Sequence, residues 1–192
     1  MNSLHKAEVR ERIIQAAIES FGQTGFDRTK MDDIAKRLGL SKGTIYLYFK
    51  SKEELFTAIC QHNMNENMKN QALFTKKENI ASDAEQIYDT IRKNERDMDK
   101  VMMEMVVEST RNPRLKKIMH EQHTMIHKHV VEEVRSKVKS GFIRHDVDID
   151  SLATALVALY DGLAINRMLG MNEQANKKAW VVAVQALLSE NG

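Results

Sequence analysis

Apolar residues recur at helical spacing through almost the whole chain, and a single proline, Pro113, interrupts that pattern. In residues 5–22 the apolar positions are separated by four, three, one and four residues, which places them along one face of a helix. They are Val9, Ile13, Ala16, Ala17 and Phe21. The alternation of apolar and polar residues that is typical of strands is absent. The sequence therefore predicts an all-α protein.

Glycine, serine and proline residues divide the pattern into about nine helices. The first covers residues 5–22, and two short helices follow it, one ending at Gly39 and the next beginning after Ser41. The remaining six are expected over about residues 52–74, 79–93, 97–109, 114–139, 148–169 and 173–189. Thr29, Ser41 and Ser51 are placed to cap the second, third and fourth helices. The expected architecture is an N-terminal three-helix domain followed by a larger helical bundle.

Composition excludes several classes of protein. The single cysteine, Cys60, excludes an internal disulfide framework and fits a reducing compartment. The N-terminal residues MNSLHKAEVRER lack the apolar stretch of a signal peptide. The most apolar windows, LATALVALYDGLA and AWVVAVQALL, are shorter than the ~20 residues that cross a bilayer. We therefore expect a cytoplasmic protein that does not span a membrane.

Positive charge is concentrated at the start of the chain. Residues 1–50 hold nine basic and six acidic residues, a net charge of +3, whereas the remaining 142 residues carry −1. This asymmetry favours a polyanionic partner for the N-terminal quarter.

The stretch LGLSKGTIYLYFKSKEEL, residues 38–55, predicts how that partner is bound. Only Leu40 separates Gly39 from Ser41, and two short helices joined by so tight a turn are typical of a helix-turn-helix. Gly43 weakens the third helix by roughly 1 kcal/mol relative to alanine, which is understandable if DNA approaches the backbone there. Lys42 is placed to donate to a guanine edge.

Further contacts to bases and phosphates follow from the same helical wheel. Ile45 and Phe49 face the preceding helices, so Thr44 and Leu47 are left to meet thymine methyl groups. Tyrosine and lysine side chains around them suit phosphates, as do the helix N-termini at Thr29 and Lys52. The predicted DNA-contacting residues are Thr29, Lys30, Ser41, Lys42, Gly43, Thr44, Tyr46, Leu47, Tyr48, Lys50 and Lys52.

Two stretches, IIQAAIESFGQTGF and TKMDDIAKRLGLSKGTIYLYFKSKEEL, resemble the N-terminal domain of the TetR family of bacterial transcriptional regulators over about residues 10–60. The resemblance implies a DNA-binding domain over residues 1–51 and a ligand-binding and dimerisation domain over residues 52–192. It also implies a homodimer that represses transcription from a pseudo-palindromic double-stranded DNA operator and is released by a small-molecule effector. A DNA-binding protein without an effector, constitutive or architectural, is the alternative.

Candidate residues for the larger domain come from its apolar stripes and its methionines. Ten of the twelve methionines lie between Met64 and Met171, and flexible thioethers suit an adaptable pocket. The expected effector pocket contains Tyr88, Met102, Met105, Met125, Tyr160 and Arg167, where an inward-facing Arg167 would suit an acidic head group. The last two helices are expected to pair with those of a second subunit through Leu152, Leu156, Leu159, Leu163, Trp180, Val184 and Leu187.

Other chemistry finds little support in the sequence. His120, His123 and His127 share one face of the long central helix, but i to i+7 spans about 10 Å, so adjacent pairs and not all three reach one metal ion. A metal-sensing regulator is kept as an alternative, with a histidine-rich surface as the default. The sequence has no G-x-S-x-G, no G-x-x-x-x-G-K and no H-E-x-x-H motif. We expect neither an enzyme nor a cofactor.

Overall fold

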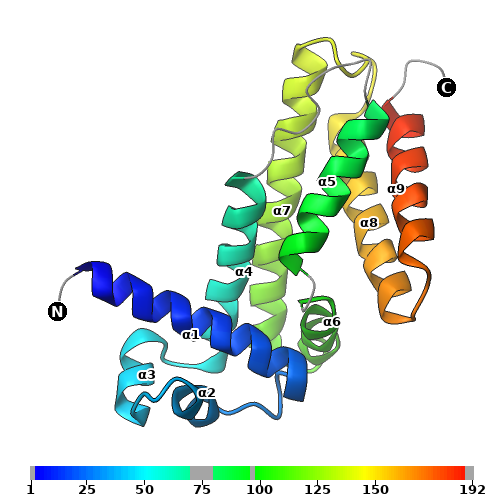
Figure 1. Cartoon of the computed structure of the whole chain (residues 1–192). Helices are drawn as coiled ribbons and strands as arrows, with labels where there is room; N and C mark the ends of the chain where they lie inside the picture. Colours follow the sequence, from blue (N-terminus) through cyan, green and yellow to red (C-terminus); the bar gives the residue numbers. More distant parts are fainter. Residues whose placement is uncertain (1–2, 70–79, 96–97, 189–192) are drawn as a thin grey trace. The chain divides into compact units, whose positions relative to one another are not determined.

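The computed structural model describes residues 3–69, 80–95 and 98–188, and within these ranges the chain is built from helices without strands (Figure 1). The nine helices of the described ranges are α1 (Ser3–Thr24), α2 (Met31–Arg37), α3 (Lys42–Tyr48), α4 (Lys52–Lys69), α5 (Ile80–Glu95), α6 (Met98–Ser109), α7 (Pro113–Lys139), α8 (Ile149–Met168) and α9 (Glu173–Leu188). The predicted all-α fold is confirmed. The predicted end of the fourth helix near residue 74 lies outside the described residues.

Two compact units make up the chain. The first contains residues 1–65 and 96–122, and thus α1, α2, α3, α6 and the beginnings of α4 and α7. The second contains residues 66–95 and 123–192, and thus α5, the rest of α7, α8 and α9. The predicted division at residue 51 is a functional one, between a DNA-binding and a ligand-binding domain. It remains a prediction.

The first unit is held together by the apolar face of α1. Ile13, Ala17 and Phe21 of the predicted stripe are fully buried, and side chains of the size of Ile13 and Phe21 each stabilise the fold by about 1.5–3 kcal/mol when buried. The Phe26 ring continues this core, 5.1 Å from the Phe21 ring and 5.9 Å from the Phe56 ring between centroids. This core fixes α2 and α3 beneath α1.

The predicted helix caps are confirmed at two of three positions. The Ser41 hydroxyl accepts a hydrogen bond from the Thr44 amide at 3.1 Å, and the Ser51 hydroxyl accepts one from the Glu54 amide at 3.2 Å. The capping role predicted for Thr29 is wrong. The Thr29 hydroxyl is buried and donates to the Gly25 carbonyl at 2.7 Å, so it does not cap α2. The N-cap residue of α2 is Lys30, whose side chain makes no capping hydrogen bond.

The turn between α1 and α2 is fastened from two sides. The Phe26 amide donates to the Glu104 carboxylate of α6 at 2.8 Å. The Lys52 ammonium donates to the carbonyls of Phe26 and Asp27 at 2.7 and 2.9 Å. Because hydrogen bonds to charged groups contribute about 1.5–3 kcal/mol, α6 and the start of α4 hold the helix-turn-helix in place within this unit.

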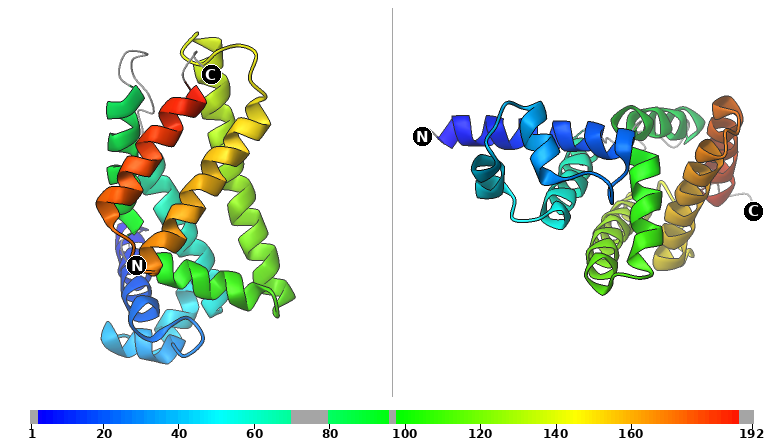
Figure 2. Two further views of the ribbon diagram at one scale, coloured as in Figure 1. Left: turned by 90° about the vertical axis from the view of Figure 1, so that its right-hand side faces the viewer. Right: turned by 90° about the horizontal axis from the view of Figure 1, so that it is seen from below.

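In the second unit α9 packs against both α5 and α8 (Figure 2). The buried Trp180 indole donates to the Ala84 carbonyl at 2.8 Å, and the Tyr88 hydroxyl donates to the Glu173 carboxylate at 2.9 Å. Lys177 pairs with two acids of α5, Glu85 and Asp89. These polar contacts fix the register between α5 and α9.

The residues predicted to contact a second subunit lie in the core of this second unit. Leu152, Leu156, Leu163, Trp180 and Val184 are buried within the single chain, and Leu159 and Leu187 pack against them. Their side chains therefore have little surface left for a partner. The physical reason is that the most apolar stripe of each helix covers the chain's own core.

A second stripe, made of smaller residues, is exposed on the same two helices. On α8 and its C-cap it consists of Ala155, Ala158, Gly162, Ile165 and Leu169, and on α9 of Ala175, Ala179, Val182 and Ala186. The first set is spaced by three, four, three and four residues, the spacing of a helix-pairing seam. We call this surface the α8–α9 stripe.

Candidate nucleic-acid interface

Helix α3 is anchored by one face and presents the other to solvent. Ile45 is fully buried and Phe49, which follows the helix, is 1% exposed. On the opposite side Leu47 is 73% exposed, and Lys42 and Gly43 are exposed with it. The predicted division of α3 into an inner and an outer face therefore matches the structure.

Gly43 has no structural reason to be glycine in this chain. A Cβ atom built at this position would meet the Ser41 hydroxyl at 3.8 Å, an ordinary contact, and no closer atom of the described residues. Its φ is not in the left-handed region that favours glycine. The free space beside α3 is thus available to another molecule.

The lysines of this surface differ in what they bind. Lys42 donates to the Asp32 carboxylate of α2 at 2.9 Å, and this hydrogen bond raises the pKa of the Lys42 ammonium. Lys50 donates to the Tyr46 carbonyl at 2.9 Å near the end of α3. Lys30 is exposed before α2. These three ammonium groups lie on accessible surface of α2 and α3.

Two residues predicted to contact phosphates, Thr29 and Lys52, make hydrogen bonds inside the protein. Thr29 is 3% exposed and its hydroxyl is hydrogen-bonded to Gly25, so it does not face solvent. Lys52 donates to the turn carbonyls already described and lies 4.7 Å from the Phe26 ring centroid. Burial lowers the pKa of Lys52, although nearby Asp27 and Glu53 oppose the shift. Both residues bind backbone carbonyls of the turn between α1 and α2.

The remaining predicted contacts are partly accessible. Tyr46 and Tyr48 are half-buried and pack against the first unit's core with part of each side chain. The hydroxyls of Thr44 and Ser41 lie 2.8 Å apart at the start of α3. Of the predicted residues, those exposed on or beside α3 are Lys30, Ser41, Lys42, Gly43, Leu47 and Lys50. Their contact with DNA remains a prediction.

Sequence reasoning missed two charged neighbours of α3. Asp32, in the first turn of α2, is the partner of Lys42. Arg10 of α1 lies 5.2 Å from the Phe49 ring centroid. Neither contact has a local sequence signal, because each joins two helices.

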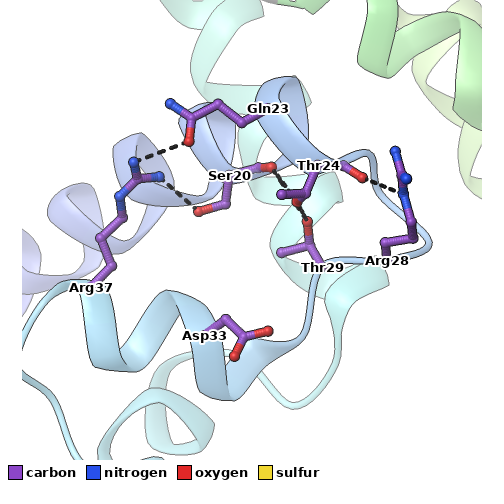
Figure 3. Close-up of a pocket in the computed structure, with 7 residues that line it drawn as sticks. All are labelled: Ser20, Gln23, Thr24, Arg28, Thr29, Asp33 and Arg37. Carbon is purple, nitrogen blue, oxygen red and sulfur yellow. Dashed lines mark hydrogen bonds between the residues drawn. The ribbon is translucent and has the colours of Figure 1, made fainter.

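A polar hollow of about 510 Å³ lies between α1 and α2 (Figure 3). It is lined by Ser20, Gln23, Thr24, Arg28, Thr29, Asp33 and Arg37. Arg37 donates to Ser20 and Gln23, and Arg28 donates to the Thr24 carbonyl. The hydrogen bonds of Arg37 connect α2 to α1 across this hollow.

The residues predicted for the effector pocket are divided between the two units. Met102 and Met105 belong to the first unit, where Met105 is fully buried in the core. Tyr88, Met125, Tyr160 and Arg167 belong to the second. There the Arg167 guanidinium lies 5.2 Å from the Tyr160 ring centroid, and the Tyr160 ring packs edge-on against Trp180. The composition of the pocket remains a prediction.

The histidines of α7 do not gather around a metal position. In the part of the chain that the structure describes, no group of three or more His, Cys, Asp or Glu side chains is placed to hold an ion. His127 contacts the Thr154 hydroxyl at 3.0 Å instead.

One described helix, α8, is long and apolar enough to cross a membrane by length and composition alone. This helix is longer than LATALVALYDGLA, the apolar window identified within it from the sequence. Its Leu152, Leu156 and Leu163 pack into the core of the second unit.

A three-helix helix-turn-helix whose last helix presents basic and apolar side chains to solvent defines a DNA-binding transcriptional regulator. The profile of the TetR family of bacterial regulatory proteins matches residues 13–59, and that of the BetI-type transcriptional repressor C-terminal domain matches residues 84–189. The chain belongs to the TetR family of bacterial transcriptional regulators.

Similar proteins span nearly the whole chain. The HTH-type transcriptional regulator YfiR of Bacillus subtilis is 22% identical over 176 residues, covering 90% of this chain and 86% of YfiR. FadR from Bacillus subtilis, solved in complex with stearoyl-CoA, has a TM-score of 0.72 and 20% identity, covering 95% of this chain and 99% of FadR. A Saccharomonospora viridis protein solved with choline has a TM-score of 0.71 and 23% identity, covering 96% and 97% of the two chains.

Proposed function

We propose that this protein is a homodimeric repressor that binds a pseudo-palindromic operator and is released by a small-molecule effector. The outward face of α3 carries the proposal, because a 73% exposed Leu47 next to Lys42 and Lys50 suits a major groove better than water. The operator lies in the bacterial cytoplasm, so we place the protein there, as a regulator without catalytic activity.

Dimerisation is supported by the α8–α9 stripe. Only 28% of the most apolar window of α8 is buried in the single chain, which leaves an apolar surface that water solvates poorly. A Cβ atom at Gly162 would meet no described atom within 4 Å, although glycine weakens a helix interior by about 1 kcal/mol. Small residues on two neighbouring helices allow close approach of the same surface from a second copy.

Effector binding is supported by the relatives and by the second unit. FadR was solved with stearoyl-CoA and the Saccharomonospora viridis protein with choline, so the shared fold accommodates different small molecules. In this chain Tyr88, Tyr160 and Arg167 bring two phenol groups and a guanidinium into the second unit. We place the effector among them and give it an acidic head group, which Arg167 suits.

A screen of small carboxylates and phosphates is expected to find compounds that raise the melting temperature and release operator DNA. Saturation at a hundred times Kd corresponds to about 2.7 kcal/mol of stabilisation. Thermal shift and DNA release, measured on the same compounds, test this expectation. Compounds that stabilise the protein without releasing DNA would point to a constitutive DNA-binding protein.

The operator itself is expected to emerge from selection of genomic fragments by the purified protein, as a few sequences that share an inverted repeat. Leu47→Ala should weaken binding to such a fragment about fivefold, because an apolar contact of about 1 kcal/mol is lost. Ile126→Ala removes an exposed apolar side chain of α7 in the second unit, outside both α3 and the α8–α9 stripe, and serves as the control. Enrichment without sequence preference, or equal effects of both variants, would contradict the proposal.

A further inference from the structure

An acidic side chain lies on the surface that is proposed to meet DNA. The Asp32 carboxylate of α2 accepts a hydrogen bond from the Lys42 ammonium at 2.9 Å. The same ammonium lies 5.9 Å from the Tyr46 ring centroid. Lys42 is therefore held between a carboxylate and an aromatic ring at the start of α3.

The stability of the fold does not explain this pair. The two side chains are 70% and 37% exposed, and exposed ion pairs contribute little to folding. Helices α2 and α3 are already joined by buried Ile34 and Ile45. A carboxylate that faces a phosphate backbone also weakens DNA binding by repulsion. Asp32 thus acts against affinity at this surface.

The hydrogen-bond donors of the Lys42 ammonium indicate how Asp32 affects the choice of DNA partner. A lysine ammonium has three N–H donors, of which Asp32 engages one. The other two remain for the O6 and N7 acceptors of guanine, which are neutral and do not repel the carboxylate. A phosphate oxygen, in contrast, is anionic and competes with Asp32 for the same ammonium. The pair therefore favours base edges over phosphates as partners of Lys42.

We propose that Asp32 is a specificity-determining residue that acts through Lys42, directing this ammonium toward base edges and penalising its use on phosphates. Asp32 is a positioning residue, and its effect falls on the ratio between operator and non-operator binding. Repulsion of the wrong partner is a general route to specificity. The inference rests on the proposed operator binding.

The test compares Asp32→Asn with Asp33→Asn. Asp33 is the next residue of α2 and lines the polar hollow (Figure 3), so its replacement removes the same charge without touching Lys42. Affinities for the selected operator and for a scrambled duplex are measured by fluorescence anisotropy at several salt concentrations. Thermal unfolding verifies that all variants are folded.

Asp32→Asn is expected to tighten binding to the scrambled duplex about fivefold and to lower the operator-to-scrambled ratio about as much. The salt dependence of scrambled binding should steepen by about one phosphate contact. Asp33→Asn should change the ratio less than about twofold. In a Lys42→Gln background, Asp32→Asn should no longer change the ratio.

Equal effects of the two Asn variants would overturn the inference, because the cause would then be net charge. A ratio that Asp32→Asn leaves unchanged, or still lowers without Lys42, would overturn it as well. Wild-type protein that binds both duplexes equally would overturn the proposed operator binding, together with this inference. Selective wild-type protein with an unaffected Asp32→Asn variant overturns the inference alone.

Discussion

Alanine at position 43 is expected to raise the free energy of unfolding by up to about 1 kcal/mol and to weaken operator binding roughly thirtyfold. The first effect follows from helix propensity, since the added methyl group meets nothing closer than the Ser41 hydroxyl at 3.8 Å. The second follows from the proposed position of DNA, where the methyl group would keep α3 from the base edges.

Effects of opposite sign on folding and on binding make Gly43→Ala more informative than most substitutions in α3. Replacing a residue that only stabilises the helix would lower both the stability of the protein and its affinity for DNA. The loss of about 2 kcal/mol in operator binding is of the size expected for one base contact. Urea unfolding and fluorescence anisotropy, performed on the same preparation, measure the two quantities.

A scrambled duplex serves as the control for Gly43→Ala, because binding through phosphates does not require α3 to reach the bases. Its affinity should change less than that of the operator. Stabilised protein with unchanged operator affinity would show that DNA does not approach the backbone at Gly43. Destabilised protein would show that the fold itself requires glycine there.

The outer face of α3 was predictable from sequence because the residues that determine it lie close together in the chain. Ser41 caps α3, Ile45 anchors it, and Leu47 lies opposite, all within two helical turns. Such relations depend on i to i+3 and i+4 spacing, which the sequence displays directly. The same holds for the helices as a whole.

Contacts between helices were the part that spacing did not predict. Lys52 looked exposed at a helix N-terminus, yet its ammonium reaches the carbonyls of Phe26 and Asp27. Asp32 and Lys42 are ten residues apart, and only the packing of α2 on α3 brings them together. Spacing also does not tell which apolar face of α9 covers its own core: Trp180 and Val184 do so, whereas Ala179 and Ala186 are exposed.

Glutamate at position 182 is expected to convert the protein into a monomer and to weaken operator binding at least about a hundredfold. Val182 is 56% exposed in the middle of the α8–α9 stripe. In the proposed dimer a carboxylate there would be buried opposite its own symmetry mate, without a partner. Two separated monomers would then bind the two half-sites independently, without the gain from linkage.

Analytical ultracentrifugation at micromolar protein and anisotropy with the selected operator measure these two changes. Val107→Glu is the matched control, since Val107 of α6 is 50% exposed and belongs to the first unit. It should leave the sedimentation coefficient unchanged. If Val182→Glu stays dimeric, or the wild-type protein is monomeric at these concentrations, the α8–α9 stripe is not the dimer interface.

Comparing Val184→Glu with Val182→Glu distinguishes a core position of α9 from a proposed interface position two residues away. Val184 is fully buried within the single chain, so its replacement by a charged residue should unfold the second unit, at a cost of several kcal/mol. Val182→Glu should leave the unfolding free energy of the isolated monomer nearly unchanged, because more than half of the Val182 side chain is exposed within the single chain. A monomeric, folded Val182→Glu variant beside an unfolded Val184→Glu variant would establish that α9 serves two surfaces, one toward its own core and one toward a partner.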